Sequence, residues 1–212
     1  MTKSAETINV QIDPGQFAAQ KKNNYSLFLA KKVNGVYTVI WQSKGAKATS
    51  GNPSYGPNDS FTVTTPSYEV NYTNTLPSKK GVKIRASGDP VTVNLGETVS
   101  LSDIGVFGKP TGSGAAGSIT IDNQLQANPH EILNDSDGNP IFVNTQSGMD
   151  IGTATLTPID RYQIWFANTQ QTGTIIAANL GKVGEVVFDG KSQVETISYD
   201  ASGNWVNAPL PS

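Results

Sequence analysis

Residues 24–41, NYSLFLAKKVNGVYTVIW, indicate the fold class of the chain. Two apolar runs flank Asn34-Gly35, a pair that favours a two-residue β-hairpin turn because both positions of such a turn need a positive φ. Successive residues of a strand point to opposite faces of the sheet. Folded at this turn, the hairpin carries on one face Leu27, Leu29, Val33, Val36 and Ile40.

The second face of the hairpin is apolar as well. It carries Phe28, Ala30, Tyr37, Val39 and Trp41, with Lys32 near the turn. An antiparallel sheet with one face in water alternates apolar and polar residues, so this hairpin needs cover on both faces. The cover is another part of the chain, a ligand or a second copy of the protein. The first alternative is favoured, with Trp165 contributing to a shared core, because large aromatic side chains are usually buried.

The rest of the chain has the same character. Its apolar segments are short, rich in β-branched and aromatic residues, and bounded by Gly, Pro, Asn or Asp, which is typical of strands joined by turns. No window keeps an amphipathic helical period, and only residues 17–22 and 128–133 are expected to form one helical turn each. The sequence therefore predicts an all-β protein, organised as a single all-β unit over residues 1–212.

Within this class we expect an antiparallel β-sandwich. Residues 25–41 align with residues 162–178, so that a Tyr, an aliphatic residue, an aromatic residue, a bulky apolar residue and an Ala coincide. This similarity indicates two pseudo-repeated halves, and chance similarity between two β-rich segments is the alternative. The halves would be residues 8–108 and 119–207, joined by the Gly/Ser-rich segment 109–118, which is flexible by composition.

Composition excludes several classes of function. The 212 residues carry a formal net charge of −2 and contain no cysteine. The chain thus lacks a field that favours nucleic acid, and it lacks disulfides and thiolate metal ligands. It shows no signal-peptide pattern at its N-terminus and no run of about 18 to 20 apolar residues for a transmembrane segment. We expect a protein that is cytoplasmic or exported without a classical signal peptide.

The sequence offers little catalytic chemistry. His130 is the one histidine, although histidine is the commonest general base. No G-x-S-x-G motif is present, and no pair of carboxylates is marked out for glycoside hydrolysis. We expect a protein that is not an enzyme and that needs no cofactor.

Residues 133–140, LNDSDGNP, contain enough oxygen ligands for calcium in principle. The spacing of a calcium-binding loop fails, however. With Gly138 as the sixth position, Leu133 would be the first, and the twelfth would be Asn144 where such a loop has a glutamate. Asn and Asp also form turns of this kind by bonding to their own backbone, so no metal is expected.

The basic residues concentrate in one place, SKKGVKIRASG at residues 78–88. Lys83 and Arg85 alternate with Val82 and Ile84, so one side of a predicted strand is positive. Lysines on an edge strand commonly prevent sheets from pairing with one another. The alternative is a site for phosphate, sulfated sugar or lipid headgroups.

Residues 105–121, GVFGKPTGSGAAGSITI, are rich in small residues. Segments of this kind can form the hairpin of a membrane-inserting β-barrel, which needs about nine to eleven alternating residues per strand. Only SITI alternates here, so a plain linker is the favoured interpretation.

The leading functional hypothesis is a non-enzymatic, lectin-like binding module that recognises carbohydrate at a cell surface. Sugars stack on aromatic rings and accept hydrogen bonds from loop residues. The candidate ligand-binding residues are Tyr37, Trp41, Asn134, Asp135, Asp137, Asn139, Trp165 and Trp205.

Two other functions stay open at this stage. One is a β-type pore-forming or membrane-acting toxin, and the other is a structural protein that assembles into homo-oligomers through its Phe28/Trp41 face. No family motif is present, although a cysteine-free, Asn- and Thr-rich all-β chain of this size resembles small microbial lectins and toxins in composition.

Overall fold

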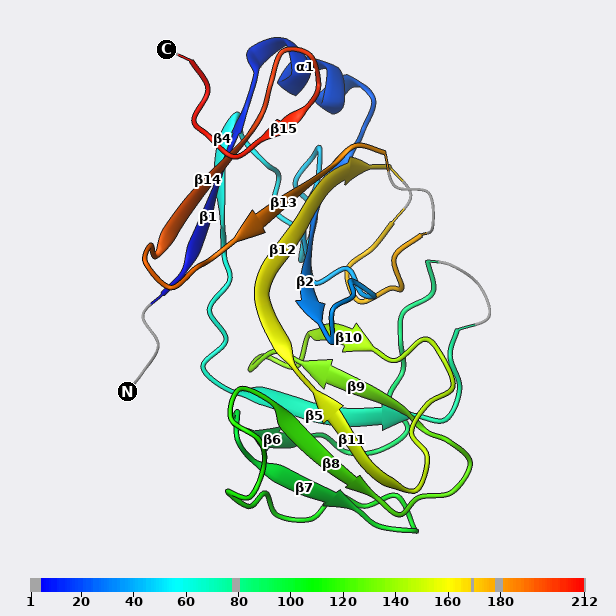
Figure 1. Ribbon diagram of the computed structural model, residues 1–212. Coiled ribbons are helices and arrows are strands. Elements are labelled where there is room, and N and C mark those ends of the chain that lie inside the picture. The colour runs from blue at the N-terminus through cyan, green and yellow to red at the C-terminus, as the bar shows by residue number, and fades with distance from the viewer. Residues whose placement is uncertain (1–4, 78–80, 169, 178–180, 212) are drawn as a thin grey trace.

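The computed structural model describes residues 5–77, 81–168, 170–177 and 181–211 (Figure 1). Strands make up 44% of the chain and helix 4%, which confirms the all-β class. The elements are β1 (Thr7–Ile12), α1 (Pro14–Lys22), β2 (Ser26–Val33), β3 (Gln42–Lys44), β4 (Asn58–Thr62), β5 (Tyr68–Thr73), β6 (Val91–Val93), β7 (Thr98–Leu101), β8 (Ile119–Asn123), β9 (His130–Asn134), β10 (Pro140–Val143), β11 (Gly152–Leu156), β12 (Pro158–Ala167), β13 (Val183–Val187), β14 (Val194–Tyr199) and β15 (Trp205–Val206).

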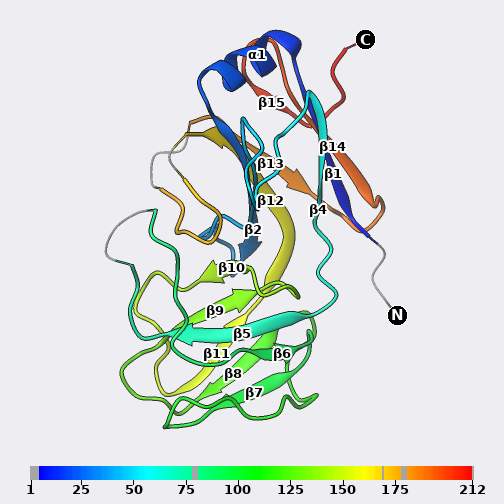
Figure 2. The ribbon, with the colours of Figure 1, turned by 180° about the vertical axis from the view of Figure 1, so that it is seen from behind.

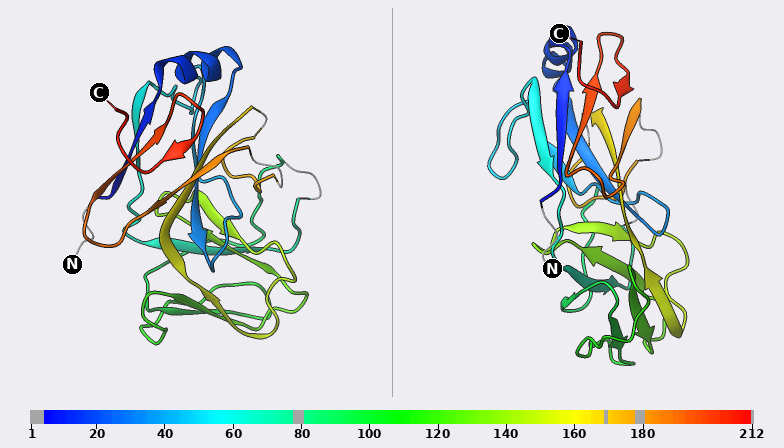
Figure 3. Two further views of the ribbon diagram at one scale, coloured as in Figure 1. Left: turned by 45° about the horizontal axis from the view of Figure 1, so that its top comes forward. Right: turned by 60° about the vertical axis from the view of Figure 1, so that its left-hand side comes forward.

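In the described residues the strands form four mostly antiparallel sheets, with the orders β15-β14-β1-β4, β13-β12-β2-β3, β10-β9-β5-β6 and β11-β8-β7. The first two lie toward the end of the molecule that carries α1, and the other two lie toward the opposite end (Figures 1 and 3). Seen from behind, β5, β9 and β10 lie side by side below β2 (Figure 2). The sandwich of two pseudo-repeated halves stays a prediction.

β2 and β12 are the two central strands of their sheet. They pair antiparallel, with Leu29 opposite Ile164 and Phe28 opposite Trp165. The two segments that align in the sequence are therefore neighbours in space. β3 pairs with the outer edge of β2, and β13 with the outer edge of β12.

One continuous core connects the four sheets. Its fully buried members include Ile8 of β1, Leu29 of β2, Val70 of β5, Ile121 of β8 and Ile164 of β12. Complete burial of an aliphatic side chain of this size contributes about 1.5 to 3 kcal/mol. The four sheets are thus held together by a shared apolar interior.

The Gly/Ser-rich segment 109–118 connects β7 to β8, which are parallel neighbours in one sheet. It also bonds back to β7 and to the turn before it: Thr111 exchanges two backbone hydrogen bonds with Thr98 of β7, and Gly114 N donates to Gly96 O at 2.9 Å. These backbone hydrogen bonds tie the segment to the β7 side of its sheet.

The turn predicted at Asn34-Gly35 is present. Both residues have a positive φ, 50° and 81°, and Val33 and Val36 exchange two backbone hydrogen bonds of 3.0 Å across the turn. The predicted pairing beyond the turn is wrong, however. Leu29 lies opposite Gln42, whereas the hairpin register predicted Ile40.

The register changes because residues 38–40 leave the hairpin and pair with residues 173–176. Val39 bridges Ile175, and Ile176 N donates to Thr38 O at 2.9 Å. Trp41 consequently packs with the core on the Leu29 side, while Ile40 packs with Phe28.

The second face of the hairpin is covered by the chain itself, which confirms the favoured expectation. Phe28, Ala30, Ile40 and Trp165 form one buried cluster, and Ile176 packs against it. The rings of Phe28 and Trp165 lie 5.8 Å apart. Phe28 is 2% exposed and Trp41 3%, so neither side chain offers surface to a second copy of the protein.

Helix α1 is longer than the single turn predicted at residues 17–22. It begins after Asp13, whose side chain accepts hydrogen bonds from Gly15 N (2.9 Å) and Gln16 N (3.1 Å). Pro14 occupies the first helical position, where its missing N–H and fixed φ are favourable. The helix therefore depends on its cap.

A buried cation lies where β12 changes register. Lys31 is 2% exposed, and its Nζ donates to Asp160 Oδ1 at 3.1 Å and to Tyr162 Oη at 2.8 Å. The β2–β12 register shifts between Ile159 and Tyr162, which brings Asp160 to the cation. Burial, followed by the charge of Asp160, raises the pKa of the Tyr162 phenol, so this hydroxyl remains protonated and donates to Val63 O.

The Asn34 side chain joins the hairpin turn to the chain between β11 and β12. Its Nδ2 donates to Thr155 O at 2.8 Å, and its Oδ1 accepts from Thr157 N at 2.8 Å. We expect Asn34→Ala to lower the free energy of unfolding by about 2 to 3 kcal/mol, since it loses two hydrogen bonds and places alanine at a positive φ. Asn34→Gly loses only the hydrogen bonds and should cost less. Urea unfolding measures both, and two variants as stable as the parent protein would contradict this role.

Candidate functional site

A polar groove lies beside the β2–β3 edge. It consists of two cavities of about 500 and 310 Å³ that share the residues Ser43, Gly51, Asn52, Lys83 and Thr172. We define the polar groove by its five lining segments, residues 41–44, 49–53, 83–84, 139–140 and 170–173, together with the single residues Ser26, Phe28 and Phe61. Five segments far apart in the sequence thus meet at one place.

Backbone pairing fixes the position of these segments. Residues 173–174 lie between residues 38–40 and 83–84: Ile40 N donates to Thr174 O (3.0 Å), and Ile84 N donates to Gly173 O (3.0 Å). These paired segments cover the second face of the hairpin, and residues 83–84 and 173 also line the polar groove. Such a lining is ordered before any ligand arrives.

The shared wall of the two cavities carries small polar side chains. Ser43 Oγ donates to Asn52 Oδ1 at 3.2 Å and lies 2.8 Å from Thr172 Oγ1. Thr49, Ser50 and Gln171 continue this wall and are exposed. The polar groove thus presents hydroxyl and amide groups that can both donate and accept hydrogen bonds.

The floor of the larger cavity is apolar. Trp41 and Phe61 line it, together with Pro53, Ile84 and Pro140. Trp41 and Phe61 are 3% and 2% exposed, so each offers an edge to the cavity and no open ring face. They shape the floor and cannot stack fully on a ligand.

Asp135 holds the Trp41 indole in place. Trp41 Nε1 donates to Asp135 Oδ2 at 2.7 Å. Asp135 Oδ1 accepts from the backbone N–H groups of Asp137 (2.9 Å) and Asn139 (2.8 Å), and Asn139 Nδ2 also donates to this carboxylate. The turn at residues 135–139 is therefore closed by its own aspartate and places Asn139 at the polar groove.

Charge in the polar groove is sparse. Lys44 is paired with Asp59. Lys83 lines both cavities and is exposed, and no ion pair with it occurs in the part of the chain that the structure describes. The polar groove is thus mostly uncharged, with one unpaired cation at its shared wall.

The structure brings together three of the predicted ligand-binding residues, Trp41, Asp135 and Asn139. Asn134 is buried at the end of β9, and Asp137 is exposed on the far part of the turn. Across the described ranges, no group of three or more His, Asp or Glu side chains could hold a metal ion.

Tyr37 lies at a different cavity of about 410 Å³, which Glu131 and Asn144 also line. Its Oη donates to Glu185 Oε2 at 2.8 Å, and burial, with this hydrogen bond, raises the pKa of the phenol. Burial also raises the pKa of Glu131, although Asn144 Nδ2 donates to both oxygens of that carboxylate. Tyr37 therefore does not share a site with Trp41.

The other two tryptophans lie outside the polar groove. Trp165 is fully buried against Phe28, which leaves no ring surface for a ligand. Trp205 packs between Tyr199 and Phe166 at ring distances of 4.8 and 5.6 Å. Trp165 therefore acts in packing, and Trp205, which is half-buried, contacts these two rings away from the polar groove.

Sequence reasoning missed Ser43, Asn52, Phe61 and Thr172. Ser, Thr and Asn are common throughout this chain, so no local signal distinguishes these positions. Lys83 alone had a signal, the basic run at residues 78–88; Lys79 and Lys80 of that run lie outside the described residues.

No protein-family model, curated protein or solved structure matches the chain. Within the described residues, no helix is long and apolar enough to cross a membrane. The polar groove is therefore interpreted from its own chemistry.

We expect Asp135→Ala to lower the free energy of unfolding by about 2 to 4 kcal/mol, because it leaves the buried Trp41 N–H and two backbone N–H groups without their acceptor. Asp137→Ala is the matched control and should change stability by less than about 0.5 kcal/mol, since its side chain is exposed. Chemical unfolding followed by tryptophan fluorescence measures both. Equal stability of the two variants would show that Asp135 does not hold the turn.

Proposed function

We propose that the polar groove binds carbohydrate and that the protein is a non-enzymatic, lectin-like recognition module. The observation that carries the proposal is a preformed groove in which hydroxyl and amide side chains stand above an apolar floor. A pyranose has the same division, with hydroxyl groups around its rim and C–H groups on its faces. Ligand sites of this type combine apolar surface with a few precisely placed polar groups.

The order of the polar groove supports this proposal. Main-chain hydrogen bonds fix residues 173–174 between two other segments, and Ser43 already contacts Asn52 and Thr172. Binding to a preformed site costs less conformational entropy than binding to mobile loops. Weak, multiple hydrogen bonds to a sugar can therefore produce useful affinity.

A membrane-acting toxin is the second candidate, favoured by the exposed side chains of Ile104 (79%) and Val106 (59%). Ile104 directly precedes the segment 105–121, and Val106 lies within it. However, Ile119 and Ile121 of that segment are fully buried in the shared core, and β8 pairs with both β7 and β11. Insertion would require β8 to leave its sheet.

A dye-release assay separates the two candidates. The carbohydrate proposal expects no leakage from lipid vesicles at micromolar protein, because the segment 105–121 stays in its sheet. Rapid leakage would favour the toxin and contradict the first proposal.

The direct test is a broad glycan array probed with labelled protein, followed by calorimetry with the best-bound glycan. We expect Gln171→Ala to weaken binding by about 1 kcal/mol, roughly fivefold, because an exposed amide of the polar groove is lost. Gln126→Ala makes the same chemical change at an exposed residue near β8 and should leave affinity unchanged. A blank array, or equal effects of the two variants, would overturn the proposal.

A further inference from the structure

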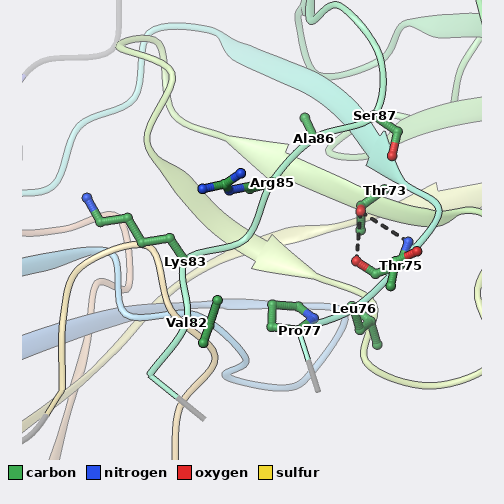
Figure 4. Close-up of a pocket in the computed structure, with 9 residues that line it drawn as sticks. All are labelled: Thr73, Thr75, Leu76, Pro77, Val82, Lys83, Arg85, Ala86 and Ser87. Atoms are coloured by element: carbon green, nitrogen blue, oxygen red, sulfur yellow. Dashed lines mark hydrogen bonds between the residues drawn. The ribbon is translucent and has the colours of Figure 1, made fainter. Parts of the chain in front are cut away.

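Lys83 lies where three cavities meet. It lines both cavities of the polar groove and also a third cavity of about 470 Å³. Figure 4 shows the third cavity, in which Lys83 and Arg85 come from one extended segment and their side chains extend to the same side of it (Figure 4). Lys83 therefore adjoins both the polar groove and the third cavity, and Arg85 lines the third cavity next to it.

Both cations lack an ion-pair partner among the described residues. Lys83 and Arg85 are exposed, and no carboxylate forms an ion pair with either of them in residues 5–77, 81–168, 170–177 and 181–211. Ile84, between them, packs against the buried cluster of Val39, Ile132 and Val143. The segment is thus anchored by its apolar residue and presents two unpaired positive charges beside the polar groove.

Protection of a sheet edge explains these charges only in part. The backbone of this segment is already engaged, since Ile84 N donates to Gly173 O (3.0 Å) and Ser87 N donates to Tyr72 O (2.8 Å). Edge lysines prevent pairing where backbone groups are free. Here the two cations flank cavities, and both are available to an anionic group.

The remaining lining of the third cavity adds hydroxyl groups and apolar surface to the two cations. Thr73, Thr75 and Ser87 place hydroxyl groups around it, and Leu76, Pro77 and Val82 give it apolar surface. The chain has a net charge of −2, so the positive charge is local. One or two acidic groups fit this arrangement better than a polyanion such as a nucleic acid.

We infer that the carbohydrate bound by the protein is acidic, with a carboxylate or sulfate group held by Lys83 and Arg85 while neighbouring sugar rings occupy the polar groove. This inference rests on the proposed function and specifies the ligand class of the same site. A carboxylate or sulfate accepts charge-assisted hydrogen bonds from both side chains, and Arg can bind it with two parallel N–H groups.

The test compares three probes by calorimetry with the full chain: a galacturonate hexasaccharide, which carries carboxylates, a heparin hexasaccharide, which also carries sulfates, and neutral maltohexaose. At least one acidic probe should bind about tenfold or more tightly than maltohexaose, and raising the salt concentration should weaken it. The tighter of the two acidic probes identifies the preferred anionic group.

Substitutions of Lys83 and Arg85 test whether these two residues bind the acidic group. Lys83→Gln should weaken the tighter acidic probe about fivefold or more, and Lys83→Gln with Arg85→Gln should weaken it further, with maltohexaose unaffected. Lys109→Gln is the control, since Lys109 is an exposed lysine near β8 and the charge change is the same. Equal binding of acidic and neutral probes, unchanged in Lys83→Gln, would overturn the inference and leave the proposed function intact. Binding of no saccharide, on the array or in solution, would overturn both.

Discussion

The structure depends on the antiparallel pairing of β2 with β12. This pairing places Leu29 and Ile164 in the core shared by all four sheets, and it places Phe28 opposite Trp165 on the second face. Each fully buried large apolar side chain contributes about 1.5 to 3 kcal/mol, so loss of the pairing would expose both faces together. The same pairing leaves one free edge on each strand, where β3 pairs with β2 and β13 pairs with β12.

The polar groove follows from the way the second face is covered. A helix could have covered this face, but the chain uses residues 38–40, 173–176 and 83–84, which pair with one another. The ends of these short segments lie beside β3, at the edge of the β13-β12-β2-β3 sheet. Near this edge Ser43 contacts Asn52 and Thr172, so the cover of a core face also forms one wall of the polar groove.

Local rules predicted part of this architecture. The Asn34-Gly35 turn was correct because its requirement for a positive φ is satisfied within two residues. The cap at Asp13-Pro14 was equally local and could have predicted α1. The register of residues 37–41 could not be read in this way, since it is decided by pairing with residues 173–176, which are distant in the sequence.

The site was less predictable than the fold class. Trp41 and Asn139 were predicted and do line the polar groove, but Trp41 proved to be nearly buried, because Asp135 holds its indole. Ser43 and Thr172 were not predicted. Ser and Thr are common in this chain, and these two residues are distinguished only because the fold brings their segments together at the polar groove.

The central claim is that the polar groove and its adjoining cations form one preformed binding site. Amide NMR of isotope-labelled protein, titrated with an acidic hexasaccharide, tests this most directly. The account predicts that the shifted resonances gather in residues 41–44, 49–53, 83–85 and 170–173, with little change elsewhere. Shifts centred on the separate Tyr37 cavity, or an unchanged spectrum at saturating saccharide, would contradict it.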